Sequence, residues 1–206
     1  MKILILNGSL RRHGSTEGVI NIGISHLGEN HSLVHPEVVH LCDQKIAMCD
    51  SCYECDRLGA CWISDGVHPT VEKMLNADAI IYATPVHAFG VNSLMQIFLE
   101  RAGVGYLRHK RPLEAKLAGV NITGRLYSHE VAWGQIALNI SLNKMTLIGS
   151  GFPALIKNDG KRLGEVIVDD EGLVSVKDML DKMVQIYGLL QTKKEERESR
   201  HHVHNL

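Results

Sequence analysis

The sequence predicts an α/β protein whose core is a doubly wound, five-stranded parallel sheet with helices on both faces. Two observations lead to this class. Short, nearly continuous apolar runs alternate along the chain with stretches that carry apolar residues at helical spacing, and polar loops follow several of the runs. Crossovers in such sheets are right-handed, and ligands bind beyond the carboxyl ends of the strands.

The first third of the chain begins with an apolar run at Lys2–Leu6, which is typical of a buried strand. Thr16–Leu27 repeats apolar residues at helical spacing and is expected to be a helix. Ser32–Leu41 is the second expected strand. Pro36 within it favours a bend or an edge position, because proline cannot donate a ladder hydrogen bond.

The middle third is expected to give a helix at Val67–Asn76, a central strand at Ala79–Ala83 and an apolar helix at Ser93–Ala102. The strand carries consecutive large apolar side chains, as a strand buried on both faces does. The polar segment between the last two elements is expected to be a loop, Thr84–Asn92.

The last third is expected to give strands at Leu117–Ile122 and Met145–Ile148, with a helix at Glu130–Lys144 between them. Residues 150–174 are rich in Gly and Asp and are expected to be irregular or a small hairpin. Ser175–Leu190 carries one apolar face and is expected to be an amphipathic helix.

Composition bounds the function. The chain has 206 residues and a formal net charge of −1, so it suits one domain, expected at 1–190, and does not suit bulk nucleic-acid binding. The charged segment 191–206 is expected to be a mobile tail, although His201, His202 and His204 lie close together in it. No apolar run approaches the ~20 residues of a membrane span, and nothing resembles a secretory leader, so a cytoplasmic location is expected.

Three polar loops are expected to meet at the carboxyl edge of the sheet. The first, GSLRRHGST, precedes a helix, and its hydroxyls, Arg11, Arg12 and free N–H groups suit a phosphate. It fits neither G-x-x-x-x-G-K-[ST] nor G-x-G-x-x-G, which favours a mononucleotide over a triphosphate or dinucleotide. An ordinary capped turn is the alternative interpretation.

The second loop, TPVHAFGVN, combines a rigid proline with apolar side chains and a flexible glycine, as the wall of a site for a flat ring does. His87 alone has a simpler interpretation, as a structural histidine. Thr123, Gly124 and Arg125 in the third loop are placed to close the site from the other side.

Four cysteines lie within thirteen residues with the spacing C-x2-C-x2-C-x5-C: Cys49, Cys52, Cys55 and Cys61. They fall in a long loop, residues 42–66, of the length that usually carries function or is disordered. Overlapping short spacings suit the thiolates of an iron–sulfur cube, whereas zinc usually takes two separate C-x2-C pairs. A metal-free set of thiols remains a third interpretation, and Cys42 is expected to be a small buried apolar residue.

Together, GSLRRHGST, TPVHAFGVNSLMQIFLERAG and CDSCYECDRLGACWISDG resemble the flavodoxin-like NAD(P)H-dependent FMN reductases, and the cysteine spacing resembles that of their iron–sulfur flavoprotein branch. The resemblance covers about residues 1–190. It implies that four cysteines, Cys49, Cys52, Cys55 and Cys61, hold a [4Fe–4S] cluster. It also implies an FMN site made of Ser9, Arg11, Ser15, Thr16, Pro85, Val86, His87, Ala88, Phe89, Gly90, Thr123 and Gly124.

By the same resemblance, the chain is expected to be an FMN-dependent NAD(P)H oxidoreductase that assembles as a homodimer or homotetramer. The donor is NAD(P)H or a ferredoxin, the acceptor is a small molecule or protein, and no catalytic side chain is nominated, because the cofactor carries the chemistry. The alternatives are a flavodoxin-like electron carrier without a substrate pocket, a reductase whose cysteines carry no cluster, and a zinc-stabilised regulatory protein.

Overall fold

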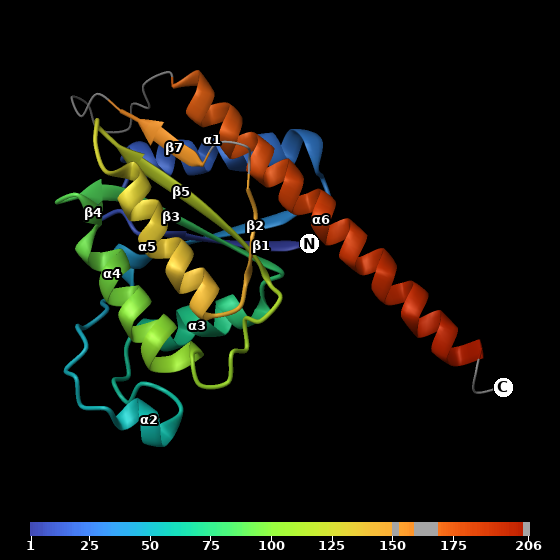
Figure 1. Cartoon of the computed structure of the whole chain (residues 1–206). Helices are drawn as coiled ribbons and strands as arrows, with labels where there is room; N and C mark the ends of the chain where they lie inside the picture. Colours follow the sequence, from blue (N-terminus) through green and yellow to red (C-terminus); the bar gives the residue numbers. More distant parts are fainter. Residues whose placement is uncertain (150–152, 159–168, 204–206) are drawn as a thin grey trace.

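A computed structural model describes residues 1–149, 153–158 and 169–203. Its parallel sheet with helices around it (Figure 1) confirms the predicted fold class. The main path of the sheet runs β2-β1-β3-β5-β6, with β4 paired to β3 and β7 paired to β5. The strands are β1 (Lys2–Asn7), β2 (His35–His40), β3 (Ala79–His87), β4 (Gly90–Val91), β5 (Leu117–Gly124), β6 (Thr146–Leu147) and β7 (Ala154–Lys157).

The predicted count of five strands is wrong, because the described sheet has seven. One extra strand arises where the expected loop Thr84–Asn92 instead extends β3 and folds back as β4, antiparallel to it. The other arises because two separate strands lie beside β5: β6 pairs at its start and β7 at its end. Residues 150–152 and 159–168, part of the segment expected to be irregular, lie outside the described residues.

The helices lie on both faces of the sheet. β1 is buried on both sides, so its alternate residues enter different cores: Leu4 and Leu6 pack on one face, Ile3 and Ile5 on the other. The first face is covered by α3 (Val67–Asn76), α4 (Ser93–Phe98) and α5 (His129–Leu142). The second is covered by α1 (Ser15–Asn30) and α6 (Asp170–Val203).

Edge and central positions follow the sequence pattern. β2 lies at the edge of the sheet, where Pro36 needs no second partner strand. β3 lies in the centre between β1 and β5, as its run of apolar residues requires.

Two helices differ from expectation. The helix expected at Ser93–Ala102 is α-helical only to Phe98 and continues as a π-helix, η2 (Leu99–Leu107). The helix expected at Ser175–Leu190 is longer than predicted: α6 begins at Asp170, continues to Val203 and projects from the body (Figure 1). Its Lys, Glu and Arg residues are strong helix formers, which explains the continuation. Within the described residues, no helix has the length and apolar content that crossing a membrane requires.

The cysteine segment leaves the sheet after β2 through a short 3₁₀ helix, η1 (Leu41–Asp43), contains α2 (Glu54–Leu58), and returns at α3. Its two ends meet closely. A Cβ atom added at Gly66 would lie only 2.0 Å from the backbone oxygen of Gln44. Only glycine therefore fits where the segment closes.

We expect Gly66→Ala to lower the free energy of unfolding by about 1–3 kcal/mol, because backbone must move to admit the methyl group. Gly28→Ala is the matched control: nothing lies within 4 Å of a Cβ there, inside α1, so about 0.5–1 kcal/mol should be gained. Urea denaturation of both variants measures the difference. A Gly66→Ala protein as stable as the parent would contradict the close approach.

Candidate functional site

The loops that follow β1, β3 and β5 are joined at the carboxyl edge of the sheet. The N–H of Gly8 donates to the carbonyl of Ala83 at 2.8 Å, and the side-chain amide of Asn92 donates to the carbonyl of Gly8. The hydroxyls of Thr16 and Thr123 share a hydrogen bond of 2.6 Å. The structure therefore brings together the three polar segments that the sequence placed at this edge.

The first loop leads directly into the N-terminus of α1. Ser9 is buried, and its hydroxyl both accepts from the N–H of Arg11 and donates to the Arg11 carbonyl, which fixes a tight turn. Gly14 is the N-cap of α1 and offers no side chain to the first N–H groups. Because those groups have no partner within a helix, this end suits an anion such as a phosphate.

The charged side chains of this loop have separate roles. Arg11 is exposed and stands beside the turn that Ser9 fixes. Arg12 forms an ion pair with Asp43 in η1, which links the first loop to the start of the cysteine segment. Of the two arginines suggested from the sequence, Arg11 is thus the one without a described ion pair.

The second segment is a tight hairpin. Val86 pairs with Val91 and His87 with Gly90, so Ala88 and Phe89 form a two-residue turn. Both have positive φ, 47° and 65°, as the hairpin turn with two left-handed residues demands. Such turns usually contain Asn and Gly, so Ala and Phe here hold a strained backbone, a feature common at ligand sites.

Each of the three segments also presents an exposed apolar side chain that a flat ring can cover. Leu10 is 51% exposed in the first, Phe89 72% in the second, and Tyr127 71% in the third, next to exposed Leu126. Leu10, Leu126 and Tyr127 were not among the residues suggested from the sequence. Their only signal is an apolar residue within a polar loop, which is too common to be decisive.

We expect Phe89→Gly to stabilise the protein and, if the flavin expected from the sequence lies here, to weaken its binding. Glycine removes the strain of a positive φ, worth roughly 1 kcal/mol, and also removes an exposed ring from the site. Thermal unfolding and fluorescence titration with FMN measure the two effects on one preparation. A variant with reduced thermal stability and unchanged FMN affinity would contradict both assignments.

The four cysteines of the C-x2-C-x2-C-x5-C motif are free thiols at accessible or partly accessible positions. Three of the sulfurs receive N–H hydrogen bonds: Cys49 from the Ser51 backbone at 3.4 Å, Cys52 from the Trp62 indole at 3.0 Å, and Cys61 from Arg101 at 3.1 Å. N–H donors aimed at sulfur stabilise thiolates and tune the potential of iron–sulfur centres.

Arg101 is the residue that ties the cysteine segment to the body. It lies in η2, its side chain is 0% exposed, and its guanidinium donates to Cys61 Sγ through Nε. Its remaining nitrogens bond to the carbonyls of Ala47 and Ile63 and to both oxygens of Asp65. A charged side chain buried this completely fixes four points of the segment at once.

The charges in this network support one another. Burial alone would raise the pKa of Asp65, but hydrogen bonds from Arg101 and from the N–H groups of Ala47 and Val67 hold it below its usual value. Burial would likewise lower the pKa of Arg101, and its bonds to Asp65 and Cys61 more than offset that. Arg101 was not identified from the sequence. The feature that could have indicated it is a single cationic residue within the apolar stretch SLMQIFLERAGVG.

The four cysteine sulfurs are not gathered around one point. Among the described residues, no three of the four cysteine sulfurs lie within 4.8 Å of one another. Thiolates on one zinc ion lie about 3.8 Å apart, since each Zn–S bond is about 2.3 Å. Thiolates of a cube each bind a different iron and lie further apart. Three of these sulfurs would therefore have to move closer together to bind one zinc ion.

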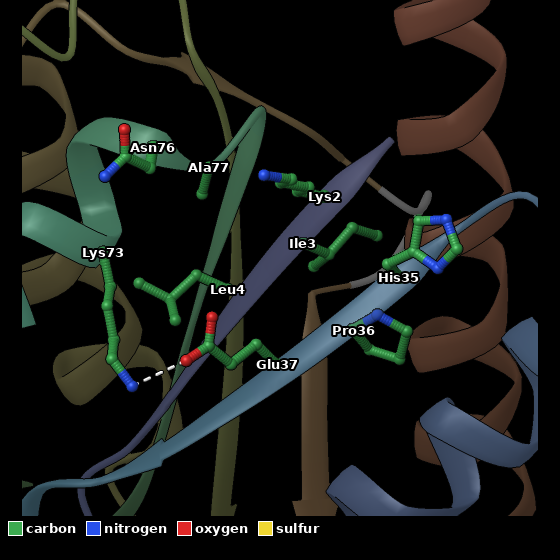
Figure 2. Close-up of a pocket in the computed structure, with 9 residues that line it drawn as sticks. All are labelled: Lys2, Ile3, Leu4, His35, Pro36, Glu37, Lys73, Asn76 and Ala77. Atoms are coloured by element: carbon green, nitrogen blue, oxygen red, sulfur yellow. Dashed lines mark hydrogen bonds and ion pairs between the residues drawn. The ribbon is translucent and has the colours of Figure 1, made fainter.

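A cavity of about 340 Å³ lies at the opposite edge of the sheet and is separate from these features. Figure 2 shows it at the start of β1 and β2, where Lys73 forms an ion pair with Glu37 across its mouth. Ligands of open α/β sheets bind at the carboxyl edge, so this cavity is not the candidate site.

Comparison with known proteins assigns the family. The sequence model of the NADPH-dependent FMN reductases matches residues 1–157. The chain belongs to this family. An iron–sulfur flavoprotein of Methanocaldococcus jannaschii is 27% identical over 195 residues, which is 92% of this chain and 99% of that protein. An iron–sulfur flavoprotein of Archaeoglobus fulgidus is 26% identical, covering 90% of this chain and 95% of its own.

A likeness to solved structures agrees on the fold. RosB, solved with bound 8-demethyl-8-formylriboflavin-5′-phosphate, superposes with a TM-score of 0.72 at 18% identity, covering 98% of this chain and 87% of its own. Membership of the FMN reductase family makes the chain an FMN-dependent oxidoreductase. The predicted family resemblance is confirmed at this level.

Proposed function

We propose that this FMN reductase family member passes electrons from a reduced nicotinamide through FMN to a [4Fe–4S] cluster held by Cys49, Cys52, Cys55 and Cys61. The observation that carries the proposal is the buried Arg101, which donates to Cys61 Sγ while bonded to Asp65. Besides attaching the segment to η2, this buried cation would compensate part of the negative charge of a thiolate-ligated cluster.

At the flavin site, the N-terminus of α1 would hold the FMN phosphate. Ser9 shapes the turn, Arg11 supplies a cation, and Ser15 and Thr16 contribute backbone N–H groups from the first turn of the helix. The Thr16 hydroxyl already bonds to Thr123, so its side chain supports the site rather than the phosphate.

The ring would lie against the hairpin. Its edge would face the backbone of the β3–β4 turn, where Ala88 and Phe89 have positive φ. Thr123 and Gly124 close the opposite side. The proposed lining is Pro85, Val86, His87, Ala88, Phe89, Gly90, Thr123 and Gly124.

The cofactors supply the redox chemistry: FMN accepts two electrons as a hydride, and an iron–sulfur cluster passes them on singly. The protein groups position the flavin, limit water at its ring and set the charge around the thiolates. No side chain is required as an acid or base. NAD(P)H is the proposed donor, with a ferredoxin as the alternative, and a small molecule or protein is the acceptor.

The two sites are well separated within one chain. Figure 1 shows α2 beyond the far end of α4, away from the β3–β4 hairpin. A homodimer or homotetramer would supply a shorter path between a flavin and a cluster. An open groove of about 410 Å³ between α4, η2 and α5, lined by Leu99, Leu138 and Leu142, offers apolar surface for such contacts. The thiols suit the reducing cytoplasm as the proposed location.

Anaerobic purification followed by an absorption spectrum and counts of flavin, iron and sulfide tests the proposal. We expect one FMN and about four iron and four sulfide per chain, with NADH or NADPH bleaching the flavin band. Flavin bleaching without iron would retain the oxidoreductase and reject the cluster. Zinc in place of iron would reject electron transfer through the cysteines.

A further inference from the structure

Two imidazoles and one carboxylate converge outside both proposed redox sites. His26 lies in α1, His31 follows the last turn of that helix, and Asp181 lies in α6. Nε2 of each histidine lies 2.7 Å from the same atom, Oδ1 of Asp181. Residues 150 positions apart in sequence therefore present three metal-ligating atoms to one point.

We propose that His26, His31 and Asp181 bind a borderline transition-metal dication of the Zn²⁺ class at the crossing of α1 and α6. Imidazole nitrogen suits Zn²⁺, Ni²⁺ and Cu²⁺, and two imidazoles with a carboxylate make a three-ligand set that leaves a position for water. Calcium or magnesium would need more oxygen ligands than this cluster supplies.

The required rearrangement is small. Ligand atoms around a tetrahedral zinc ion lie about 3.3 Å apart, since each bond is about 2.0–2.1 Å. The two N···O separations therefore need to open by roughly half an ångström. The Asp181 side chain is 46% exposed, which leaves it room for that movement, whereas His26 and His31 are 15% and 25% exposed.

The backbone around the cluster is already fixed. The N–H of His31 donates to the carbonyl of Leu27 at 2.7 Å and caps α1. At Gly23, one turn before His26, α6 approaches α1 so closely that a Cβ would lie 3.1 Å from Leu180. The helix that carries Asp181 is thus held against the helix that carries His26. Binding a metal ion would therefore cost little conformational entropy of the backbone.

The surroundings supply an outer shell and a route of entry. The Asn30 side-chain nitrogen donates to the His26 carbonyl and lies 3.2 Å from Nδ1 of that ring, whose Nε2 lies toward Asp181. With a metal on Nε2, Nδ1 carries the proton, so the Asn30 amide would have to turn to present its oxygen as the acceptor. An open cavity of about 320 Å³ borders His26 and is lined also by Glu29 and Lys177. The negative charge of Glu29 would offset the repulsion between Lys177 and a cation that enters the cavity.

Zinc titration by calorimetry tests the site on full-length protein purified with its flavin and iron. His201, His202 and His204 are first changed to alanine, so that the tail histidines do not compete. We expect this background protein to bind one Zn²⁺ per chain at the cluster, and Asp181→Asn to weaken that binding at least tenfold. Zn²⁺ should raise the Tm of the background protein and not that of Asp181→Asn.

His35→Gln in the same background is the matched control, because His35 is an exposed histidine on β2 that is not one of the three converging ligands, and zinc binding should be unchanged. Should Asp181→Asn fold poorly by circular dichroism, His31→Gln replaces it. Cu²⁺ resonance spectra then report whether coupling to two imidazole nitrogens is reduced. Zinc binding equal in all variants, or no zinc binding in the background protein, would overturn the proposal. The three side chains would then serve only to join α1 and α6 by hydrogen bonds.

Discussion

Arg101→Gln is expected to lower the free energy of unfolding by about 3–5 kcal/mol and to release most of the bound iron. Glutamine leaves Asp65 as an uncompensated buried charge and removes the donor to Cys61. It also removes the bonds to Ala47 and Ile63, so the cysteine segment loses its attachment to η2. Urea denaturation and iron counts on the anaerobic protein measure both losses.

The matched control is Arg57→Gln. Arg57 lies in the same cysteine segment and pairs with Glu54, but its side chain is 71% exposed, so the change should cost less than about 1 kcal/mol. Equal stability and iron content in Arg101→Gln and Arg57→Gln would contradict the role given to Arg101.

The Arg101 network also predicts a pH dependence. Because the folded pKa of Asp65 lies below its ordinary value of 3.8, its stabilisation is present above that value and is lost as pH falls through the lowered pKa. Without Arg101, only the N–H groups of Ala47 and Val67 would oppose the effect of burial on the Asp65 pKa. The stability gap between parent and Arg101→Gln should therefore be widest at neutral pH and narrow in acid, as measured by urea denaturation across pH.

Ser15→Asp is expected to weaken FMN binding by about 100-fold while leaving riboflavin binding within about threefold. An aspartate in the first turn of α1 stabilises the helix by about 0.3–1 kcal/mol, so the fold is kept. Its carboxylate would repel the proposed phosphate, and two charges near 4 Å interact by about 4 kcal/mol at the surface of a protein. Riboflavin has the same ring and no phosphate.

Fluorescence titration of the two flavins separates these effects. Arg11→Ala serves as a milder companion: about tenfold weaker FMN binding, fading at high salt because the residue is exposed. If Ser15→Asp weakened FMN and riboflavin equally, the variant would have damaged the ring site, and the phosphate would not lie at α1. Unchanged affinity for both flavins would place the whole site elsewhere.

Most of the fold was predicted from the spacing of apolar residues along the sequence. The buried strands read as apolar runs, and Pro36 marked an edge strand, because both features reflect local hydrogen bonding and burial. The β3–β4 hairpin was missed, since Ala88 and Phe89 are not turn-forming residues and adopt positive φ only with support from the fold. The continuation of α6 past Leu190 was not predicted, because a charged segment of this composition can be either an irregular tail or an exposed helix.

Part of the candidate site could be predicted from the sequence. Thiol spacing and loop polarity are local in sequence, so the cysteines and the three loops could be named from the chain alone. Arg101 acts across 36 to 54 positions of sequence, and a lone arginine in an apolar helix does not reveal its partners. The Thr16–Thr123 bond spans 107 positions, and a contact of that range has no local signature in the sequence.

The most direct test of the account is an anaerobic reductive titration of the isolated protein, followed by absorption and paramagnetic resonance. We predict about three electron equivalents per chain, two entering FMN and one entering the cluster. Uptake of only two equivalents, with no signal from reduced iron, would contradict the cluster, and uptake of none would contradict a bound flavin.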